Sequence, residues 1–390
     1  MNVFQQKHFS QGLTGTINSA WLRSPAWDAF WIHSGLWLTL LMFTVKSAAV
    51  QEMFYAAGVF LFWISHRFSS FYLAWGTQAY RPLLKKQQWR FIYFPLLLIL
   101  LVFAALFLPQ TIIIIPVSER IIGLLLLDFC WGIHHFSAQH YGILRLYHHR
   151  WNPENAPSAN QQERWYCWGV GGGLVFIAEL LHGTSFLQEK NILPLLTADM
   201  LIEVLPMLLR FGTLIVIGTT YFMIQQAWKN ESGWPRILYI LGVGVLVSAA
   251  FQLEPVQFLM LWTLQHWLVA VGLTAHMGSN DFPKKTNEVT VLLENKSGHN
   301  TKKAWLLVLI FCVFSIVLTP FFEIEAVSAG ERYSEQVLPM LMEWLNNSSW
   351  LRLLVGVGLA SGFLHYFMDR AVYRFSDPET RTGAQRLLLA

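Results

Sequence analysis

Five of the thirteen histidines in the sequence fall between residues 133 and 150, in the segment IHHFSAQHYGILRLYHHR. The apolar run IIGLLLLDFCWG leads into this segment, so His134, His135 and His140 are predicted to lie on a transmembrane helix. An ionisable side chain at the centre of a membrane helix costs roughly 2.5–3.5 kcal/mol on insertion scales, and such residues usually mark functional sites. The segment therefore indicates a site within the membrane. The two histidines that close it are interpreted instead as part of a basic cluster at the lipid headgroups.

Polar residues at helical spacing accompany His135. Asp128, His135 and Gln139 are separated by seven and four residues, so they share one face of the predicted helix. His134 and His140 point elsewhere on the same helix. Asp128, Gln139 and His140 are therefore held in reserve, and the sequence leaves open whether His134 or His140 replaces His135 as a ligand.

Three further histidines lie in other apolar segments: His66 in ISHRFSS, His266 in LQHWL and His365 in HYFMDR. His365 and Asp369 stand at positions i and i+4, so both can address one centre, or the carboxylate can orient the imidazole. The predicted metal ligands are His66, His135, His266, His365 and Asp369.

The residue types in this set indicate metal chemistry. Imidazole and carboxylate ligands without thiolates suit iron, copper, manganese or zinc, and they exclude an iron–sulfur cluster. Four histidines and a carboxylate suit a mononuclear or dinuclear non-haem iron centre with open positions for dioxygen. Gln139 or His140 is then expected to position oxygen or substrate, and Asp369 to serve as a ligand or a base. The same histidines are also suited to be axial ligands of a haem.

The composition predicts the elements that must hold these residues. The chain is 54% hydrophobic and 13% charged, with a mean hydropathy of +0.42, whereas soluble domains have about 25% charged residues. Because a bilayer span takes about 20 residues, the length of 390 residues suits roughly ten spans. We therefore expect an all-α polytopic membrane protein, with about ten helices at residues 26–45, 52–75, 91–108, 119–147, 165–184, 201–228, 236–253, 256–277, 304–322 and 350–372.

Basic residues distinguish the two sides of this predicted bundle. If connections alternate between the sides from an inner N-terminus, twenty Lys and Arg residues fall on one side, and only Lys46, Lys190 and Arg332 fall clearly on the other. The positive-inside rule then predicts that both termini are cytoplasmic, in a membrane of the bacterial inner (plasma) membrane type.

This topology gives each intramembrane histidine a predicted depth. His66, His135, His266 and His365 lie roughly 7–11 residues from the cytoplasmic ends of their spans, which is about 10–16 Å at about 1.5 Å per residue. Four histidines on four helices are thus expected at one level in the cytoplasmic half of the membrane. Isolated histidines such as His33 and His182 are interpreted as helix-to-helix hydrogen bonds.

The rest of the chain is expected to be structural. Residues 1–390 are interpreted as a single transmembrane domain in which 279–303 form a cytoplasmic linker and 331–347 form an amphipathic helix at the outer surface. The linker includes VTVLL, which has the pattern of a short strand. The run GVGGGLVF at 169–176 is typical of a small-residue face that packs against another helix.

The histidine pattern resembles that of the membrane histidine-cluster iron enzymes, namely the fatty-acid desaturases and hydroxylases and the intramembrane carotenoid-cleaving oxygenases. The segment HHFSAQH contains the spacing H-x4-H found in the desaturases. The HxxHH boxes of that family do not occur in the sequence, and H-x3-Q and H-x3-D stand in their place. The resemblance covers a handful of positions and implies a reaction class, which is oxidation by dioxygen.

These observations predict an enzyme, a membrane-embedded non-haem iron oxidoreductase. It is expected to oxidise, desaturate or cleave a hydrophobic substrate that enters from membrane lipid, with electrons from a donor the sequence does not identify. No nucleic-acid partner is expected. Two alternatives remain open at this stage: a haem-binding or quinol-linked electron-transfer subunit, and a metal-free acyltransferase that uses one intramembrane histidine as general base.

Overall fold

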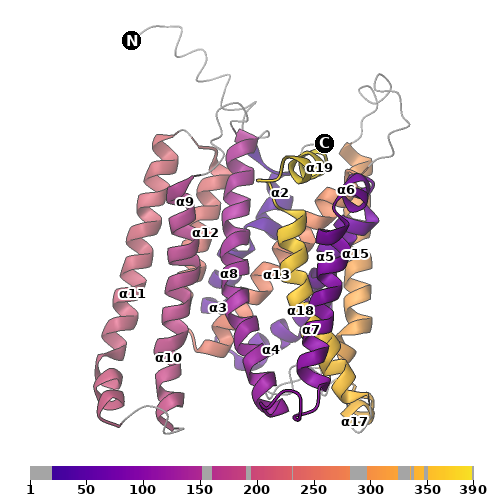
Figure 1. The fold of residues 1–390 in the computed structure, drawn as a ribbon. Coiled ribbons are helices and arrows are strands. Elements are labelled where there is room, and N and C mark those ends of the chain that lie inside the picture. The colour runs from indigo at the N-terminus through magenta and orange to yellow at the C-terminus, as the bar shows by residue number, and fades with distance from the viewer. Residues whose placement is uncertain are drawn as a thin grey trace, which may run out of the picture. The chain divides into compact units, whose positions relative to one another are not determined.

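The computed structural model describes residues 20–151, 160–189, 195–230, 232–281, 297–323, 334, 338–346 and 350–388. These residues form helices and no strand, which confirms the predicted all-α class (Figure 1). The chain divides into two compact units that alternate along the sequence. Unit 1 comprises Met1–Gln51 and Ile133–Val269, and unit 2 comprises Glu52–Gly132 and Ala270–Ala390.

Seven helices within the described residues are long and apolar enough to cross a membrane, as expected of an integral membrane protein. They are Ala48–Gly76, Trp89–Phe107, Val117–Trp151, Glu203–Lys229, Pro255–Ser279, Thr301–Phe322 and Leu351–Val372. Two shorter apolar helices, Ser34–Thr44 and Trp234–Ala250, coincide with two more predicted spans. The total of ten spans and the cytoplasmic side of the termini stay predictions.

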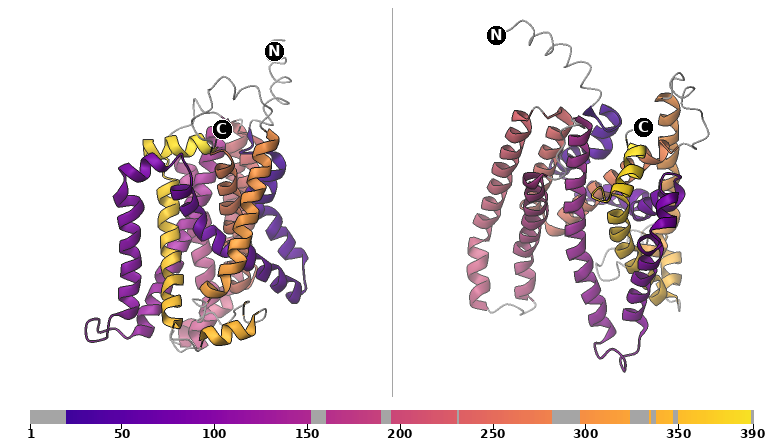
Figure 2. Two further views of the ribbon diagram at one scale, coloured as in Figure 1. Left: turned by 90° about the vertical axis from the view of Figure 1, so that its right-hand side faces the viewer. Right: turned by 45° about the horizontal axis from the view of Figure 1, so that its top comes forward.

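Unit 1 contains helices from both of its stretches. Their bounds are α2 (Pro25–Trp27), η1 (Asp28–Ile32), α3 (Ser34–Thr44), α9 (Gln161–Trp165), η5 (Tyr166–Leu174), α10 (Val175–Glu189), α11 (Leu195–Lys229) and α12 (Trp234–Ala250), with Ile133 onward of α8 (Val117–Trp151) and the start of α13 (Pro255–Ser279). Helix α11 packs on α10 and α12, and α12 packs on α3, as two orientations show (Figures 1 and 2). Elements η1 and η5 are π-helical, a form that often occurs beside functional residues.

Capping and charge fix the start of two elements in unit 1. The Ser24 side chain accepts a hydrogen bond from the backbone N–H of Trp27 and so begins α2. Asn160 caps α9 in the same way, and it places Glu163 in the first turn. Glu163 is fully buried and accepts hydrogen bonds from Arg236 and Arg145.

The environment of Glu163 changes its acidity. Burial favours the neutral acid, but the nearby His148 and the positive charges of Arg236 and Arg145 outweigh burial and hold the pKa of Glu163 below its usual 4.5. His148, predicted to belong to an interfacial basic cluster, therefore lies next to an acidic partner, with 3.9 Å between its Nδ1 and Glu163 Oε1.

The small-residue run at 169–176 lies in η5 and the first residues of α10, and it packs against α8 within unit 1. A Cβ atom added to Gly172 would lie 2.4 Å from Ser137 Oγ, and one added to Gly171 would lie 3.7 Å from His140 Cδ2. The predicted helix-packing role of this run is therefore confirmed. The close approach sets the position of the segment of α8 that carries the histidines.

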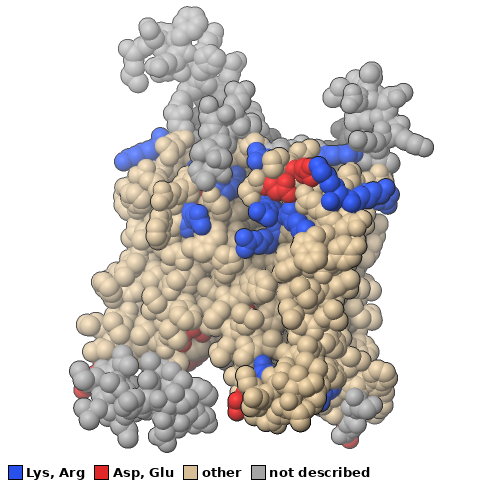
Figure 3. Space-filling view, in the orientation of Figure 1, with Lys and Arg blue, Asp and Glu red and all other residues tan. Residues whose placement is uncertain are grey.

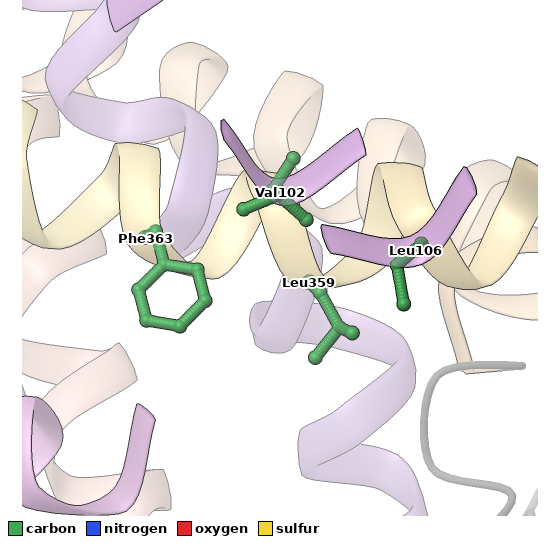
Figure 4. Packing of buried hydrophobic residues seen from close by; sticks show 5 residues of the cluster. Val102, Leu106, Leu359 and Phe363 are labelled. Atoms are coloured by element: carbon green, nitrogen blue, oxygen red, sulfur yellow. The ribbon is translucent and has the colours of Figure 1, made fainter. Parts of the chain in front are cut away.

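Unit 2 is organised around helix α18 (Leu351–Val372). The other elements are α4 (Ala48–Gly58, shared with unit 1), η2 (Val59–Trp63), α5 (Ile64–Phe71), η3 (Tyr72–Gly76), α6 (Arg81–Lys86), η4 (Trp89–Tyr93), α7 (Phe94–Phe107), α15 (Ser297–Phe322), α17 (Pro339–Asn346) and α19 (Pro378–Leu388), with the start of α8 up to Gly132 and the end of α13 from Ala270. Helix α18 packs on α5, α7 and α15. Val102 and Leu106 of α7 meet Leu359 and Phe363 of α18 in a buried apolar core (Figure 4).

One end of unit 2 carries paired charges. Lys86 of α6 contacts Glu379 of α19, and Arg90 Nη1 lies 2.8 Å from Asp377 Oδ2. Acidic and basic side chains accordingly gather over α6 and α19 (Figure 3). Along the lipid-crossing helices large apolar side chains are exposed instead, for example Leu100 at 64%. This contrast is expected where helix sides face lipid and helix ends face water.

The two predicted connections are only partly described. Helices α13 and α15 extend to Ser279 and from Ser297 into the predicted linker at 279–303, and VTVLL lies outside the described residues. Within 331–347, α17 buries Met342 and Leu345 and exposes Met340 and Trp344. The described part of this segment is therefore an amphipathic helix, while its location at the outer membrane surface stays a prediction.

Candidate functional site

Four buried residues are of the types that ligate metals, two in each unit. They are His135, His266, His365 and Asp369, each with a ligand atom available. Their exposed fractions are all 7% or less, so none is an ordinary surface residue. His135 and His266 belong to unit 1, and His365 and Asp369 belong to unit 2.

In unit 1, His135 of α8 and His266 of α13 face each other through their Nε2 atoms, which are 3.3 Å apart. Their rings meet edge to face, with centroids 4.8 Å apart. The ring of Phe136 stacks on His266 with a centroid separation of 4.2 Å and covers one side of the pair. Two residues that are 131 positions apart in the sequence are thereby held in one rigid contact.

Gln139 determines which nitrogen of His266 is available. The Nδ1–H of His266 donates a hydrogen bond of 2.9 Å to Gln139 Oε1. A neutral imidazole carries one hydrogen, so Nε2 of His266 keeps its lone pair and faces His135. The amide thus orients a candidate ligand, as residues behind a metal ligand commonly do. Gln139 was predicted to position oxygen or substrate, and the structure places it on His266.

The separation of the two Nε2 atoms fits a shared metal ion. With metal–nitrogen bonds of about 2.0–2.1 Å, two nitrogens at angles between 90° and the tetrahedral angle lie about 2.8–3.4 Å apart. The observed 3.3 Å falls in this range. Two axial ligands on opposite sides of one iron would instead be about 4 Å apart, twice the bond length. The pair therefore matches chelation better than ligation of a haem.

The neighbouring histidines of α8 have other partners. His134 accepts a hydrogen bond of 3.2 Å from Trp168 Nε1, and His140 Nδ1 lies 2.9 Å from the hydroxyl of Tyr239. The alternatives left open by the sequence are thus separated by geometry, because only His135 meets His266. His182, interpreted as a helix-to-helix hydrogen bond, donates from Nε2 to Ala250 O at 3.2 Å, which agrees with that interpretation.

In unit 2, His66 of α5 and His365 of α18 form the corresponding histidine pair. Their rings meet edge to face with centroids 4.6 Å apart. His66 donates from Nδ1 to Trp63 O in the π-helical segment η2, which fixes its ring and leaves Nε2 with the lone pair. His365 Nδ1 lies 3.5 Å from Asp369 Oδ1, so these residues, predicted at i and i+4, lie close together.

The reserve residue Asp128 also lies against α18. A Cβ atom added to Gly362 would be 3.2 Å from Asp128 Oδ1 and 3.8 Å from Arg67 Nη2. Glycine at this position therefore leaves space for a carboxylate and a guanidinium within the apolar helices of unit 2. A common depth for His66, His135, His266 and His365 stays a prediction from the sequence.

An apolar cavity of ≈ 750 Å³ lies in unit 2, and His66 and His365 are not among its lining residues. Aromatic and aliphatic side chains form most of its wall, among them Phe68, Phe71, Trp75, Leu96, Phe103 and Leu364. Its few polar groups include Arg67 and Ser361, which bind each other at 2.8 Å. Helices α5 and α18 both line the cavity and carry His66 and His365.

Sequence reasoning missed several of these contacts. Tyr239 lies in an apolar segment with no pattern that marks it, although a tyrosine amid buried residues is expected to find a hydrogen-bond partner. Trp63 contributes through its backbone carbonyl, and no sequence pattern reveals such a role. The chain shows no significant match to known protein families, curated proteins or solved structures.

Proposed function

We propose that the protein is a membrane-embedded, metal-dependent oxidoreductase that acts on a hydrophobic, lipid-like substrate. The observation that carries the proposal is the contact between His135 and His266, whose Nε2 atoms are 3.3 Å apart inside an apolar protein. The proposed metal is non-haem iron, and the proposed setting is a bacterial inner membrane.

In this proposal the metal ligands come from two pairs of buried residues, one pair in each unit. His135 and His266 bind through Nε2, and His365 and Asp369 contribute an imidazole and a carboxylate. Imidazole and carboxylate ligands without thiolate suit non-haem iron. Coordination would also explain why a membrane protein carries several histidines in apolar helices, because a ligated imidazole is not an uncompensated polar group.

The protein's own residues orient and shield these ligands. Gln139 holds His266 in the tautomer with a free Nε2, and Phe136 covers the ring of His266. Trp63 O likewise holds His66 in the tautomer with a free Nε2. His66 is proposed either to bind the metal or to support His365. When bound, iron would supply one-electron and dioxygen chemistry. Asp369 is proposed as a ligand or as a base for a nearby proton.

The cavity of unit 2 supports a hydrophobic substrate. A volume of ≈ 750 Å³ lies within the range of about 300–1,000 Å³ typical of small-molecule sites. Such sites are usually lined by apolar side chains with a few placed polar groups, and Arg67 and Ser361 are candidates for those groups here. The substrate is therefore proposed to lie along α5 and α18, with its polar end toward Arg67.

Metal content of the purified full chain tests the proposal. We expect wild-type protein in lipid nanodiscs to contain stoichiometric iron with no Soret band. The variants His135→Gln, His266→Gln, His365→Gln and Asp369→Asn are expected to lose it. His134→Gln is the matched control, because His134 lies next to His135 on α8 but binds Trp168.

The pattern of loss is as informative as the loss itself. If each pair holds its own ion, each substitution is expected to remove half the metal. Full metal content in all four variants, or none in folded wild-type protein, would overturn the assignment. A Soret band would decide for the haem-binding electron-transfer alternative.

A further inference from the structure

A small cavity lined by both polar and apolar residues lies inside unit 1. Its volume is ≈ 10 Å³, about that of one water-sized sphere and close to the minimum that holds a water molecule. His33, His140, Tyr239 and Gln265 line it together with apolar residues and two glycines. These four side chains are each 5% exposed or less, so the cavity is sealed by buried groups.

Three buried polar atoms of the lining residues have no hydrogen-bond partner among the residues that the structure describes. They are His33 Nδ1, His140 Nε2 and Gln265 Oε1. A buried polar group without a partner costs about 1–3 kcal/mol, so three around one small cavity call for a common ligand. Buried waters typically make about three hydrogen bonds to such groups.

The hydrogen positions follow from the neighbouring bonds. Tyr147 OH lies 2.9 Å from Asp28 Oδ2 and 3.2 Å from His33 Nε2. An ionised carboxylate only accepts, so the single hydrogen of Tyr147 goes to Asp28, and His33 Nε2–H donates to Tyr147. Nδ1 of a neutral His33 is then an acceptor.

A water in the cavity completes this pattern. His33 Nδ1 and Gln265 Oε1 both accept, so they use both hydrogens of the water. His140 Nε2 must therefore donate to the water oxygen, which leaves His140 Nδ1 to accept from Tyr239 OH at 2.9 Å. Every polar atom at the cavity is then satisfied, and every donor in the chain from Tyr239 to Asp28 points in the same direction.

We propose that this cavity holds one structural water, and that Tyr239, His140, the water, His33, Tyr147 and Asp28 form a proton path through unit 1. A proton that arrives at Tyr239 O moves the hydroxyl hydrogen to His140 Nδ1. His140 Nε2–H passes to the water, a water hydrogen to His33 Nδ1, His33 Nε2–H to Tyr147, and Tyr147 O–H to Asp28. One proton enters at Tyr239, one is held at Asp28, and no intermediate group keeps a charge.

The two ends of the path, Asp28 and Tyr239, lie in different surroundings. Asp28 lies in η1, three residues beyond Pro25, which is exposed, and it accepts hydrogen bonds from the backbone of Leu22 and Arg23. At the other end, Tyr239 contacts His140, which follows Gln139 on α8. Gln265, which lines the cavity, precedes His266 on α13. The use of the path, to exchange protons with the proposed metal centre, rests on the proposed function. The water and the path themselves do not.

Nitrogen-15 NMR of histidine-labelled full-length protein in lipid bilayers tests the water. Signals of His33 and His140 are assigned by their loss in His33→Gln and His140→Gln. Both rings are expected to be Nε2–H tautomers that receive magnetisation directly from water. An Nδ1–H tautomer at either ring, or a cavity without water contact, would overturn the proposal.

Hydrogen–deuterium exchange of the His33 ring N–H tests the path. Tyr147→Phe keeps the ring that stacks on His33, at a centroid distance of 5.6 Å, but removes the link to Asp28. Exchange at His33 is expected to slow by about tenfold, because one hydrogen bond of the path is lost. Tyr166→Phe is the matched control, since Tyr166 is equally buried in unit 1 but binds Thr220 and Ile240.

An unchanged exchange rate in folded Tyr147→Phe, or an equal slowing in Tyr166→Phe, would contradict the path. Neither readout depends on bound metal or on turnover. A failure of the path is therefore distinguishable from a failure of the proposed function.

Discussion

Replacing Gln139 by leucine isolates the orienting role of one side chain. Leucine is close to glutamine in size but cannot accept the hydrogen bond of 2.9 Å from His266 Nδ1. His266 then loses the interaction that keeps its Nε2 free, and its Nδ1–H is left buried. Loss of a group that orients a metal ligand typically lowers metal affinity about 10–100-fold. That factor corresponds to about 1.4–2.8 kcal/mol of binding free energy.

Competition with graded chelator concentrations, read as retained metal per chain, measures this change. Gln139→Glu keeps an acceptor for Nδ1–H and is expected to bind metal at least as tightly as wild type. Gln257→Leu serves as control, because Gln257 lies on α13, the helix of His266, but binds Gln51. If folded Gln139→Leu retains wild-type affinity, the reasoning about the tautomer of His266 is refuted. A change of about 1 kcal/mol in unfolding free energy without any metal effect would indicate a structural hydrogen bond only.

Three further predictions concern stability and substrate. Because the pKa of Glu163 is lowered, its ionised form stabilises the folded state above pH 4.5, and this contribution is lost as pH falls through the folded-state pKa. Thermal melts of Glu163→Gln should show a free energy of unfolding lower by about 3–5 kcal/mol at neutral pH. The stability of this variant should also fall less steeply than that of wild type as pH is lowered. Leu96→Trp, which enlarges an exposed wall residue of the apolar cavity, should lower turnover or lipid co-purification and leave metal content unchanged, and equal substrate binding would argue against that cavity. Gly244→Ala should destabilise the protein by about 1–3 kcal/mol in the same melts, because its Cβ would lie 2.3 Å from Thr220 Oγ1; an unchanged melting temperature would show that Thr220 can move aside.

Local patterns in the sequence predicted local structure well. Apolar runs predicted helices at every segment because chain length and hydrophobicity act within one element. The pairing of His365 with Asp369 was also predictable, since both lie on one helix and helical geometry fixes their separation. The spacing of Gln139 likewise placed it on the face of His135.

Contacts between helices were beyond such patterns. The choice of His266 as the partner of His135 depends on packing between residues 131 positions apart, and no spacing rule encodes it. The role of Gln139 changed for the same reason, because its acceptor faces a histidine from another helix. The short apolar helix Ser34–Thr44 shows why the number of spans is also difficult, since hydropathy identifies an apolar segment better than it fixes a helix end.

The alternation of the two units along the sequence has a consequence for biosynthesis. Unit 1 is complete once Val269 has been made, so the His135–His266 contact can form on a nascent chain that still lacks α15 and α18. His66 must wait for His365, which is 299 residues later (365 − 66), or roughly 15–60 s at about 5–20 residues per second. During that interval α5, which carries His66, is in the membrane without α18. We therefore expect membrane chaperones and quality-control proteases to act on this protein while unit 2 is incomplete.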